Sequence, residues 1–403
     1  MSQRVSRVQW LGVAIVYLII NLLRSRYSIH HLIPDPGLSF QLSAWSDDPL
    51  AVLGRFGGYP QVAPRIVSEF LNLIPLPQLT YWSTALNSAV AMTCSLLIAM
   101  ALTPSIGFRL AILPGMFLAT SFPAFEGLIG NVWAIRWLLL PATCVVVLSD
   151  FAKQHWRISF VLFLLTGLSH PYVFIPAIFF FTRAWTERDF KSKTGLLGLT
   201  LAGTVLFQGF AFLTGSRSSR LYGDSTVYWP WTGSGIYWIA VFALPTGIAL
   251  ISIPFAISNS KIVSRTYSPR VAMAIQATLL ALLSYLQLGI KSSPAVATST
   301  VSYAAIILAT NDVGHTFKSM FSRLVTLTSS IVMLILNVRY FLASSYLTNG
   351  LSWSQVVSRG VADCQTSSIS QVELTYFING DFSNSELIDC HQLALWVEWF
   401  FRR

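Results

Sequence analysis

The chain has 403 residues, of which 54% are hydrophobic and only 10% are charged, and its mean hydropathy is +0.61. Soluble domains contain about 25% charged residues, so this composition excludes a soluble enzyme, a disordered chain and a small disulfide-stapled domain, and it indicates a protein of the lipid bilayer. Basic loops on the cytoplasmic side of a membrane explain most of the formal net charge of +10, so no nucleic-acid partner is predicted.

The first apolar segment, 8–23, follows a basic start. No small-residue cleavage site follows it, so we interpret it as a retained signal anchor. A polar and proline-rich stretch then extends to about residue 78. The later apolar segments are 83–102, 110–122, 132–148, 158–168, 172–181, 196–213, 236–257, 271–290, 295–309 and 324–342. Several are shorter than the roughly 20 residues of a straight span, which favours extended ends or paired, re-entrant helices.

Basic clusters determine the predicted topology. They lie at 150–157, 183–193, 258–270 and 315–323, and the positive-inside rule places all four in the cytoplasm. This assignment requires a hairpin between 158 and 181 that reverses near Ser169, His170 and Pro171. The sequence thus predicts an all-α polytopic protein of the cytoplasmic (inner) membrane, with about eleven transmembrane or re-entrant helices. The N-terminus is predicted in the cytoplasm and the C-terminus outside it. Arg24 and Arg26, at the start of the predicted external loop, oppose the positive-inside rule.

Four regions follow from this topology. They are a signal-anchor helix over 1–23, an external loop over 24–80, a multi-helix membrane domain over 81–343 and a small external C-terminal region over 344–403. The C-terminal region holds Cys364 and Cys390, and two cysteines in one external segment are expected to form a disulfide in an oxidising compartment. Cys94 and Cys144 lie in apolar segments, so we expect them in the core.

The first external loop carries the adjacent carboxylates Asp47 and Asp48, followed by Pro49. Such a pair at the membrane edge is able to act as a general base or to bind a divalent cation. Asp48 is equally well suited to cap a helix that begins at Pro49. The cap and a catalytic role for Asp47 are compatible with each other.

This order of a signal anchor, a long external loop with an acidic pair, many apolar segments and a small external C-terminal region resembles the C-type (GT-C) superfamily of membrane glycosyltransferases, over nearly the whole chain. The stretch GGYPQVAPR also resembles one that follows the acidic pair in bacterial O-antigen-modifying glucosyltransferases. The resemblance implies a GT-C-like fold, a polyprenyl-phosphate sugar donor and a glycan or glycolipid acceptor outside the cytoplasm. It implies that Asp47 or Asp48 activates the acceptor hydroxyl. The C-terminal part of this sequence is small, unlike the large soluble domains of some members, so the resemblance does not identify the acceptor.

Basic residues on the predicted external side are candidates for binding the donor phosphate. They are Arg55, Arg65, Arg136, Lys291 and Arg339. Arg136 and Arg339 are flanked by apolar residues, where a charge is retained with a partner such as a lipid phosphate. The alternative for each of these residues is a side chain that reaches the lipid headgroups unaided. Taken together, however, these five basic residues lie on the side opposite the basic cytoplasmic loops, and this favours the interpretation that they form a phosphate-binding site.

Other external residues are candidates for substrate contacts. They are Tyr59, Glu69, His170, Arg217, Arg220 and Trp229. His170 is suited to bind phosphate or sugar, but it is equally able to serve as a hydrogen-bonded structural residue. Trp229 is suited to stack on a sugar, and the alternative is a position at the membrane interface. The histidines and cysteines show no zinc spacing, and no P-loop or GxGxxG motif is present. No metal site and no cofactor are therefore predicted, apart from the cation alternative at the acidic pair.

The sequence thus favours an inverting glycosyltransferase that uses a polyprenyl-phosphate sugar. A flippase or transporter of a lipid-linked glycan is the first alternative, but that class usually has charged groups near the membrane midplane and internal repeats, and neither is visible here. A polysaccharide polymerase or ligase is the second alternative. Those proteins usually carry their large loop late in the chain, whereas here it follows the first apolar segment.

Overall fold

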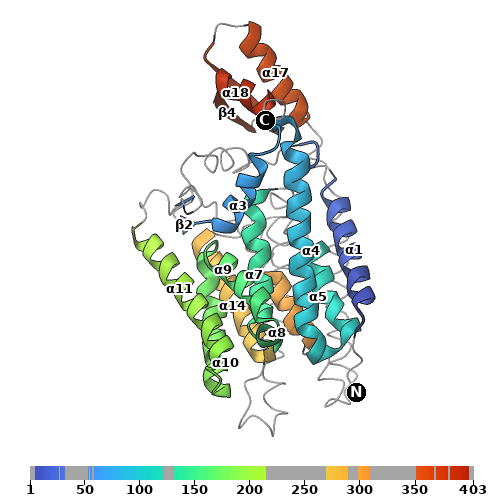
Figure 1. The fold of residues 1–403 in the computed structure, drawn as a ribbon, viewed down its shortest axis with the longest axis vertical. Helices are drawn as coiled ribbons and strands as arrows, with labels where there is room; N and C mark the ends of the chain where they lie inside the picture. The colour runs from blue at the N-terminus through green and yellow to red at the C-terminus, as the bar shows by residue number, and fades with distance from the viewer. Residues whose placement is uncertain are drawn as a thin grey trace, which may run out of the picture.

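The computed structural model describes residues 5–26, 28–31, 53, 55–56, 59–120, 131–214, 269–288, 298–308, 351–366, 369–379 and 382–398. The molecule is a bundle of helices with a small C-terminal region at one end (Figure 1). We call the end that carries this region and helix α3 the apical end. The opposite end, where helix α1 begins and helix α8 lies, is the basal end.

Helix α1 (Arg7–Arg24) matches the predicted anchor segment. It begins with a capping box, in which the Ser6 hydroxyl accepts from the Gln9 N–H (3.2 Å) and the Gln9 side chain accepts from the Ser6 N–H (2.8 Å). Its inner side is fixed by Tyr17, whose hydroxyl donates to the Ile112 carbonyl (2.7 Å). Large apolar side chains of α1 remain exposed, as expected for a helix in contact with lipid.

Helices α4 (Leu79–Ile106) and α5 (Phe108–Thr120) form an antiparallel pair beside α1. The 28 residues of α4 give a length of about 42 Å, enough to cross a bilayer. Gly107 lies between the two helices with φ +78°, a conformation that side chains with a Cβ rarely adopt. The chain therefore reverses at the basal end within one residue.

The predicted hairpin between 158 and 181 is confirmed. The 3-10 helix η4 (Val132–Ala134), helix α7 (Ile135–Val146) and the short helix α8 (Phe151–Gln154) lead to helix α9 (Trp156–Gly167). The chain reverses at the 3-10 helix η5 (Pro171–Val173) and returns in helix α10 (Phe174–Glu187). Pro171 occupies the first position of η5, where its missing N–H costs nothing.

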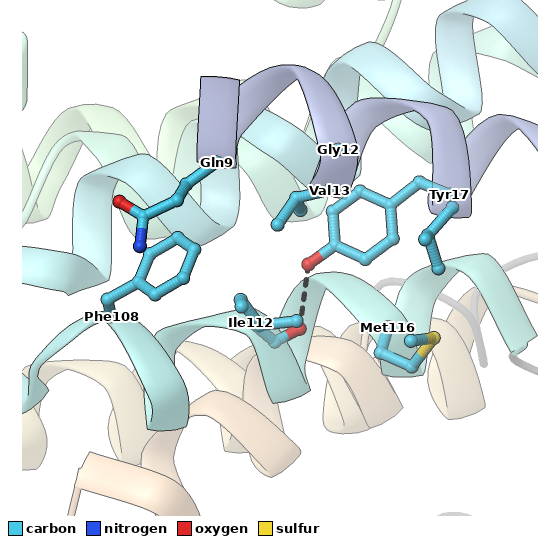
Figure 2. A pocket seen from close by; sticks show the side chains of 8 residues that line it. Gln9, Gly12, Val13, Tyr17, Phe108, Ile112 and Met116 are labelled. Carbon is cyan, nitrogen blue, oxygen red and sulfur yellow. Dashed lines mark hydrogen bonds between the residues drawn. The ribbon is translucent and has the colours of Figure 1, made fainter. Parts of the chain in front are cut away.

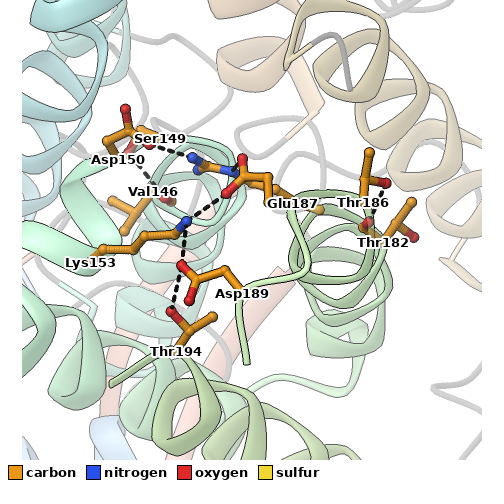
Figure 3. A network of polar contacts seen from close by, with 10 residues as sticks. Val146, Ser149, Asp150, Lys153, Thr182, Thr186, Glu187, Asp189 and Thr194 are labelled. Atoms are coloured by element: carbon orange, nitrogen blue, oxygen red, sulfur yellow. Dashed lines mark hydrogen bonds and ion pairs between the residues drawn. The ribbon is translucent and has the colours of Figure 1, made fainter. Parts of the chain in front are cut away.

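An ion-pair network closes the basal end of this hairpin (Figure 3). Lys153 in α8 pairs with Glu187 (2.5 Å) and with Asp189 (2.8 Å), which precedes helix α11 (Ser192–Thr214). Arg183 of α10 pairs with Glu187 (2.7 Å) and Asp150 (2.5 Å). The network therefore joins α8, α10 and the start of α11.

Helix α14 (Pro269–Leu288) and the helix Thr298–Leu308 complete the described part of the bundle. Within the described residues, three helices are long and apolar enough to cross a membrane, namely Arg7–Arg24, Leu76–Ile106 and Ser192–Ala211, and five shorter apolar helices accompany them. These helices indicate a membrane protein that is mostly helical. The predicted segments 236–257 and 324–342 lie outside the described residues, and each of the others coincides with a helix.

The predicted loop 24–80 contains regular structure of its own. Strands β1 (Arg55–Phe56) and β2 (Tyr59–Pro60) pair antiparallel, with Arg55 opposite Pro60. Helix α3 (Val62–Leu71) and the 3-10 helix η2 (Leu76–Gln78) follow. The described residues of this region therefore form a folded part of the apical end.

The C-terminal region contains helix α17 (Trp353–Thr366), strands β3 (Gln371–Asn379) and β4 (Phe382–Asp389), and helix α18 (Cys390–Glu398). This β3–β4 hairpin is an addition to the predicted all-α architecture. The expected Cys364–Cys390 disulfide is present and joins α17 to α18. Trp353 attaches the region to the bundle, because its indole N–H donates to the Leu76 carbonyl and its backbone N–H to the His30 carbonyl, both at 2.7 Å.

Candidate functional site

Helix α3 is held against the apical turn of the α9–α10 hairpin. The Ala63 N–H donates to the Ser169 hydroxyl (2.8 Å), and the Val62 N–H donates to the Leu168 carbonyl (3.3 Å). These bonds satisfy two of the backbone donors that the first turn of any helix leaves unpaired. They place α3 directly beside His170, and α3 also contacts η4 and α7. Three segments that are distant in sequence thus meet at the apical end.

Arg65 lies on the buried side of α3, with 3% of its surface exposed. Burial lowers the pKa of its guanidinium, whereas the nearby carboxylate of Glu69, one helical turn later, acts in the opposite direction. An arginine remains charged in either case. Burial likewise raises the pKa of the half-buried Glu69 carboxyl, and Arg65 counteracts that effect. The structure therefore places a buried positive charge on α3 with a carboxylate beside it.

Arg136, in the first turn of α7, is also buried, with 2% of its surface exposed. Its guanidinium carbon lies 4.0 Å from the centre of the Trp133 ring and 5.3 Å from that of Trp137. Aromatic faces attract a cation in this position. The side chain thus packs on aromatic rings inside the protein, which does not fit the alternative that it extends unaided to lipid headgroups.

His170, which follows the residues bonded to α3 and whose ring contacts Trp137 of α7, is buried, with 1% of its surface exposed. Its Nδ1 accepts from the Tyr172 backbone N–H (3.1 Å), so the side chain caps η5. Its ring meets the edge of the Trp137 ring, with 4.2 Å between ring centres. Burial, and to a smaller extent the charge of Arg136, lower the pKa of His170 well below 6.5.

These contacts determine which nitrogen of His170 carries the proton. Since the ring is neutral and Nδ1 is an acceptor, the proton must be on Nε2. Nε2 is buried, and among the described residues it has no hydrogen-bond partner. A buried donor without an acceptor costs about 1–3 kcal/mol, so an acceptor that binds at this point would recover a substantial free energy.

The remaining predicted site residues lie partly or wholly outside the described structure. Arg55 and Tyr59 are placed by their backbone alone, in the β1–β2 pair. Those outside the described residues are Asp47, Asp48, Lys291, Arg339, Arg217, Arg220 and Trp229. In the part of the chain that the structure describes, no group of three or more His, Cys, Asp or Glu residues is suited to hold a metal ion.

Several residues of the apical end were not among the predicted site residues. Trp133 and Trp137 flank Arg136 in the sequence VWAIRW, and their positions three residues before and one after the arginine are a signal for ring contacts. Ser169 was predicted only to lie at the turn of the 158–181 hairpin, without a role in the site. Arg24, noted only for opposing the positive-inside rule, is buried and donates through Nη1 to the Ala119 carbonyl (2.9 Å).

Comparison of the chain with protein-family models, curated proteins and solved structures finds no match.

Proposed function

We propose that this protein is an integral-membrane glycosyltransferase of the GT-C type, which transfers a sugar from a polyprenyl-phosphate donor to a glycan or glycolipid acceptor. The observation that carries the proposal is the buried Nε2–H of His170 beside the buried Arg136. A neutral donor next to a cation is suited to bind an oxygen of an anionic group. It is less suited to bind a cation or an apolar ligand.

A phosphate at this position agrees with the chemistry of the proposed donor. When the bond between the anomeric carbon and the phosphate oxygen breaks, negative charge increases on the phosphate. Arg136, Arg65 and the Nε2–H of His170 would stabilise that charge, and the stabilisation is strong because the three groups are buried. They are fixed by ring stacking, by α3 and by the cap at η5, so little reorganisation accompanies the reaction.

The acidic pair would supply the base. Asp47 and Asp48 precede Arg55 by eight and seven positions in the sequence, and β1 begins at Arg55. In the proposed step the acceptor hydroxyl oxygen attacks the anomeric carbon while its proton passes to one carboxylate. Polyprenyl phosphate leaves from the opposite face, so the configuration at the anomeric carbon inverts.

The distribution of charge supports an external position for the apical end. The exposed basic residues near the basal helix ends are Arg7, Arg109, Arg157, Arg188, Lys191 and Lys193. By the positive-inside rule these residues favour a cytoplasmic basal end. The Cys364–Cys390 disulfide in the apical C-terminal region agrees, because disulfides are stable in oxidising compartments.

The test measures sugar transfer in membranes. Glycan analysis of cells that lack the protein identifies the missing sugar, and membranes are then supplied with the matching labelled polyprenyl-phosphate sugar. We expect Asp47→Asn, Asp48→Asn or their combination to abolish transfer, and Arg136→Gln to reduce it by about 100-fold or more. Asp363→Asn and Arg157→Gln are the controls, because both side chains are exposed and lie on α17 and α9, outside the segments that carry Arg65, Arg136 and His170.

Full activity of the double aspartate variant would contradict the base assignment. Unaltered glycans in cells without the protein would contradict the proposed reaction. If labelled lipid crossed the membrane in reconstituted vesicles without any sugar transfer, the flippase alternative would replace the transferase.

A further inference from the structure

A groove between α1 and α5 lies near the basal end, far from the candidate site (Figures 1 and 2). It has a volume of about 340 Å³, within the range of small-molecule sites. Its lining residues are Gln9, Gly12, Val13, Val16, Tyr17, Phe108, Ile112 and Met116. All but Gln9 present apolar surface, and the Tyr17 hydroxyl is engaged with the Ile112 carbonyl. The groove is therefore suited to a hydrocarbon ligand.

The shape of the groove depends on two residues. Gly12 has no side chain, and a Cβ placed there would meet nothing within 4 Å, so the space above it is open. Tyr17 closes the apical side, where its hydrogen bond fixes the distance between α1 and α5. The groove lies along a helix that is long and apolar enough to cross a membrane. In a membrane, the hydrocarbon chains of the lipids would therefore be next to the groove and available to bind in it.

Positive charge surrounds the basal mouth of the groove. Helices α1 and α5 both begin at this end, where the rings of Trp10 and Phe108 meet edge to face, with 5.1 Å between centres. Arg7 and Arg109 lie in these first turns, and both are exposed. Neither has an ion-pair partner among the described residues, and neither helix has an acidic residue in its first turn. The positive end of the α1 dipole adds to the two arginines, whereas that of α5 is offset by the C-terminal end of α4 at Ile106.

We infer that this groove is a binding site for an anionic phospholipid of the leaflet at the basal end. One acyl chain lies in the groove over Gly12, and the phosphate of the headgroup lies between Arg7 and Arg109. Two exposed arginines that have no ion-pair partner among the described residues favour a headgroup with net negative charge over a zwitterionic one. The site is independent of the proposed sugar transfer.

The test is a competition between lipids that differ only in the headgroup. The purified full-length protein is equilibrated with equal amounts of phosphatidylglycerol and phosphatidylcholine with identical acyl chains, and native mass spectrometry measures the lipid that each protein molecule retains. We expect the wild-type protein to retain phosphatidylglycerol preferentially. Arg7→Gln and Arg109→Gln should each lower that preference by about fivefold, since one arginine near the surface contributes about 1 kcal/mol to such binding.

A second variant tests the groove itself. Gly12→Leu fills the open space and should abolish the retained lipid, whereas Gly203→Leu on α11, where a Cβ also meets nothing within 4 Å, should leave it unchanged. Arg157→Gln, an exposed arginine at the start of α9, is the control for the charge variants. Arg7→Gln and Arg109→Gln each replace an exposed side chain, so the test does not depend on Gly12→Leu folding normally.

Three outcomes would overturn the inference. The first is equal retention of the two lipids by the wild-type protein. The second is a preference that Arg7→Gln and Arg109→Gln leave unchanged. The third is retained phosphatidylglycerol that an equal concentration of polyprenyl phosphate displaces from the wild-type protein, which would make the polyprenyl lipid the occupant.

Discussion

The two ring nitrogens of His170 have different tasks. Nδ1 accepts from the Tyr172 N–H and so caps η5, which is a structural role. Nε2 carries the proton and has no partner among the described residues, which leaves it available to an acceptor on a ligand. A substitution that removes only one of the two nitrogens can separate these roles.

His170→Asn is that substitution. The asparagine side-chain oxygen reaches the position of Nδ1 and is a favourable helix cap, but the residue is too short to replace Nε2. We expect thermal unfolding of the purified protein to change little and the rate of sugar transfer to fall by about 100-fold, the usual effect of losing one donor to a developing anion. The measurements are a melting curve in detergent and the membrane transfer assay.

His170→Gln provides the opposite comparison. Its amide reaches toward the position of Nε2 but does not place an acceptor at Nδ1, so it should lose about 1 kcal/mol of cap stability and keep more of the activity than His170→Asn. Equal activity of His170→Asn and the wild-type protein would mean that His170 is only a cap.

At the scale of elements, the ion-pair network fixes the basal end of the α9–α10 hairpin. The hydrogen bond from Lys153 lowers the pKa of Asp189. Burial alone would raise the pKa of Glu187, but hydrogen bonds from Lys153 and Arg183 outweigh it and lower that pKa. Carboxyl groups with a lowered pKa stabilise the folded state at pH values above their ordinary pKa of about 4, and the stabilisation is lost as the pH falls below it.

Lys153→Gln should therefore destabilise the protein by about 1 kcal/mol or less at neutral pH, because the paired side chains are about one-third exposed and solvent weakens the pairs. Thermal unfolding at several pH values checks this. The difference from the wild-type protein should disappear below about pH 4. Lys193→Gln, an exposed lysine near the same end, is the control. An effect of Lys153→Gln that did not depend on pH would show that the side chain acts by packing alone.

The apolar segments of the bundle could be predicted from the sequence because each has a composition that only a membrane or a core accommodates. The hairpin reversal at His170 and Pro171 could also be predicted, since charge required it and proline supplied the break. Helix α3 could not, because its bonds to Ser169 and Leu168 come from a segment about 100 residues later. The β3–β4 hairpin had a usable signal in Gly380-Asp381, because glycine at the first of two connecting residues is typical of a tight hairpin turn.

At the scale of the whole molecule, the position of a site depends on which distant segments the fold brings together. Arg65, Arg136 and His170 could each be selected from the sequence as isolated polar residues on the predicted external side. Their burial, and the contact between the Trp137 and His170 rings, could not, because these depend on how α3, α7 and η5 pack. The choice of residue types was therefore predictable, whereas their mutual geometry was not.

The orientation of the whole molecule is open to a direct test with cysteine labelling. Cys94 and Cys144 are buried and Cys364 and Cys390 are paired in a disulfide, so the native protein offers little background to a maleimide. Ser358→Cys on α17 and Lys193→Cys on α11 place single thiols at exposed positions of the apical and basal ends. If the basal end is cytoplasmic, as the positive-inside rule requires, a membrane-impermeant maleimide should label Ser358→Cys in intact cells, and Lys193→Cys only after permeabilisation. The reverse pattern would place the buried arginines and His170 on the cytoplasmic side, where a nucleotide sugar would be available and a lipid-linked donor would no longer be required.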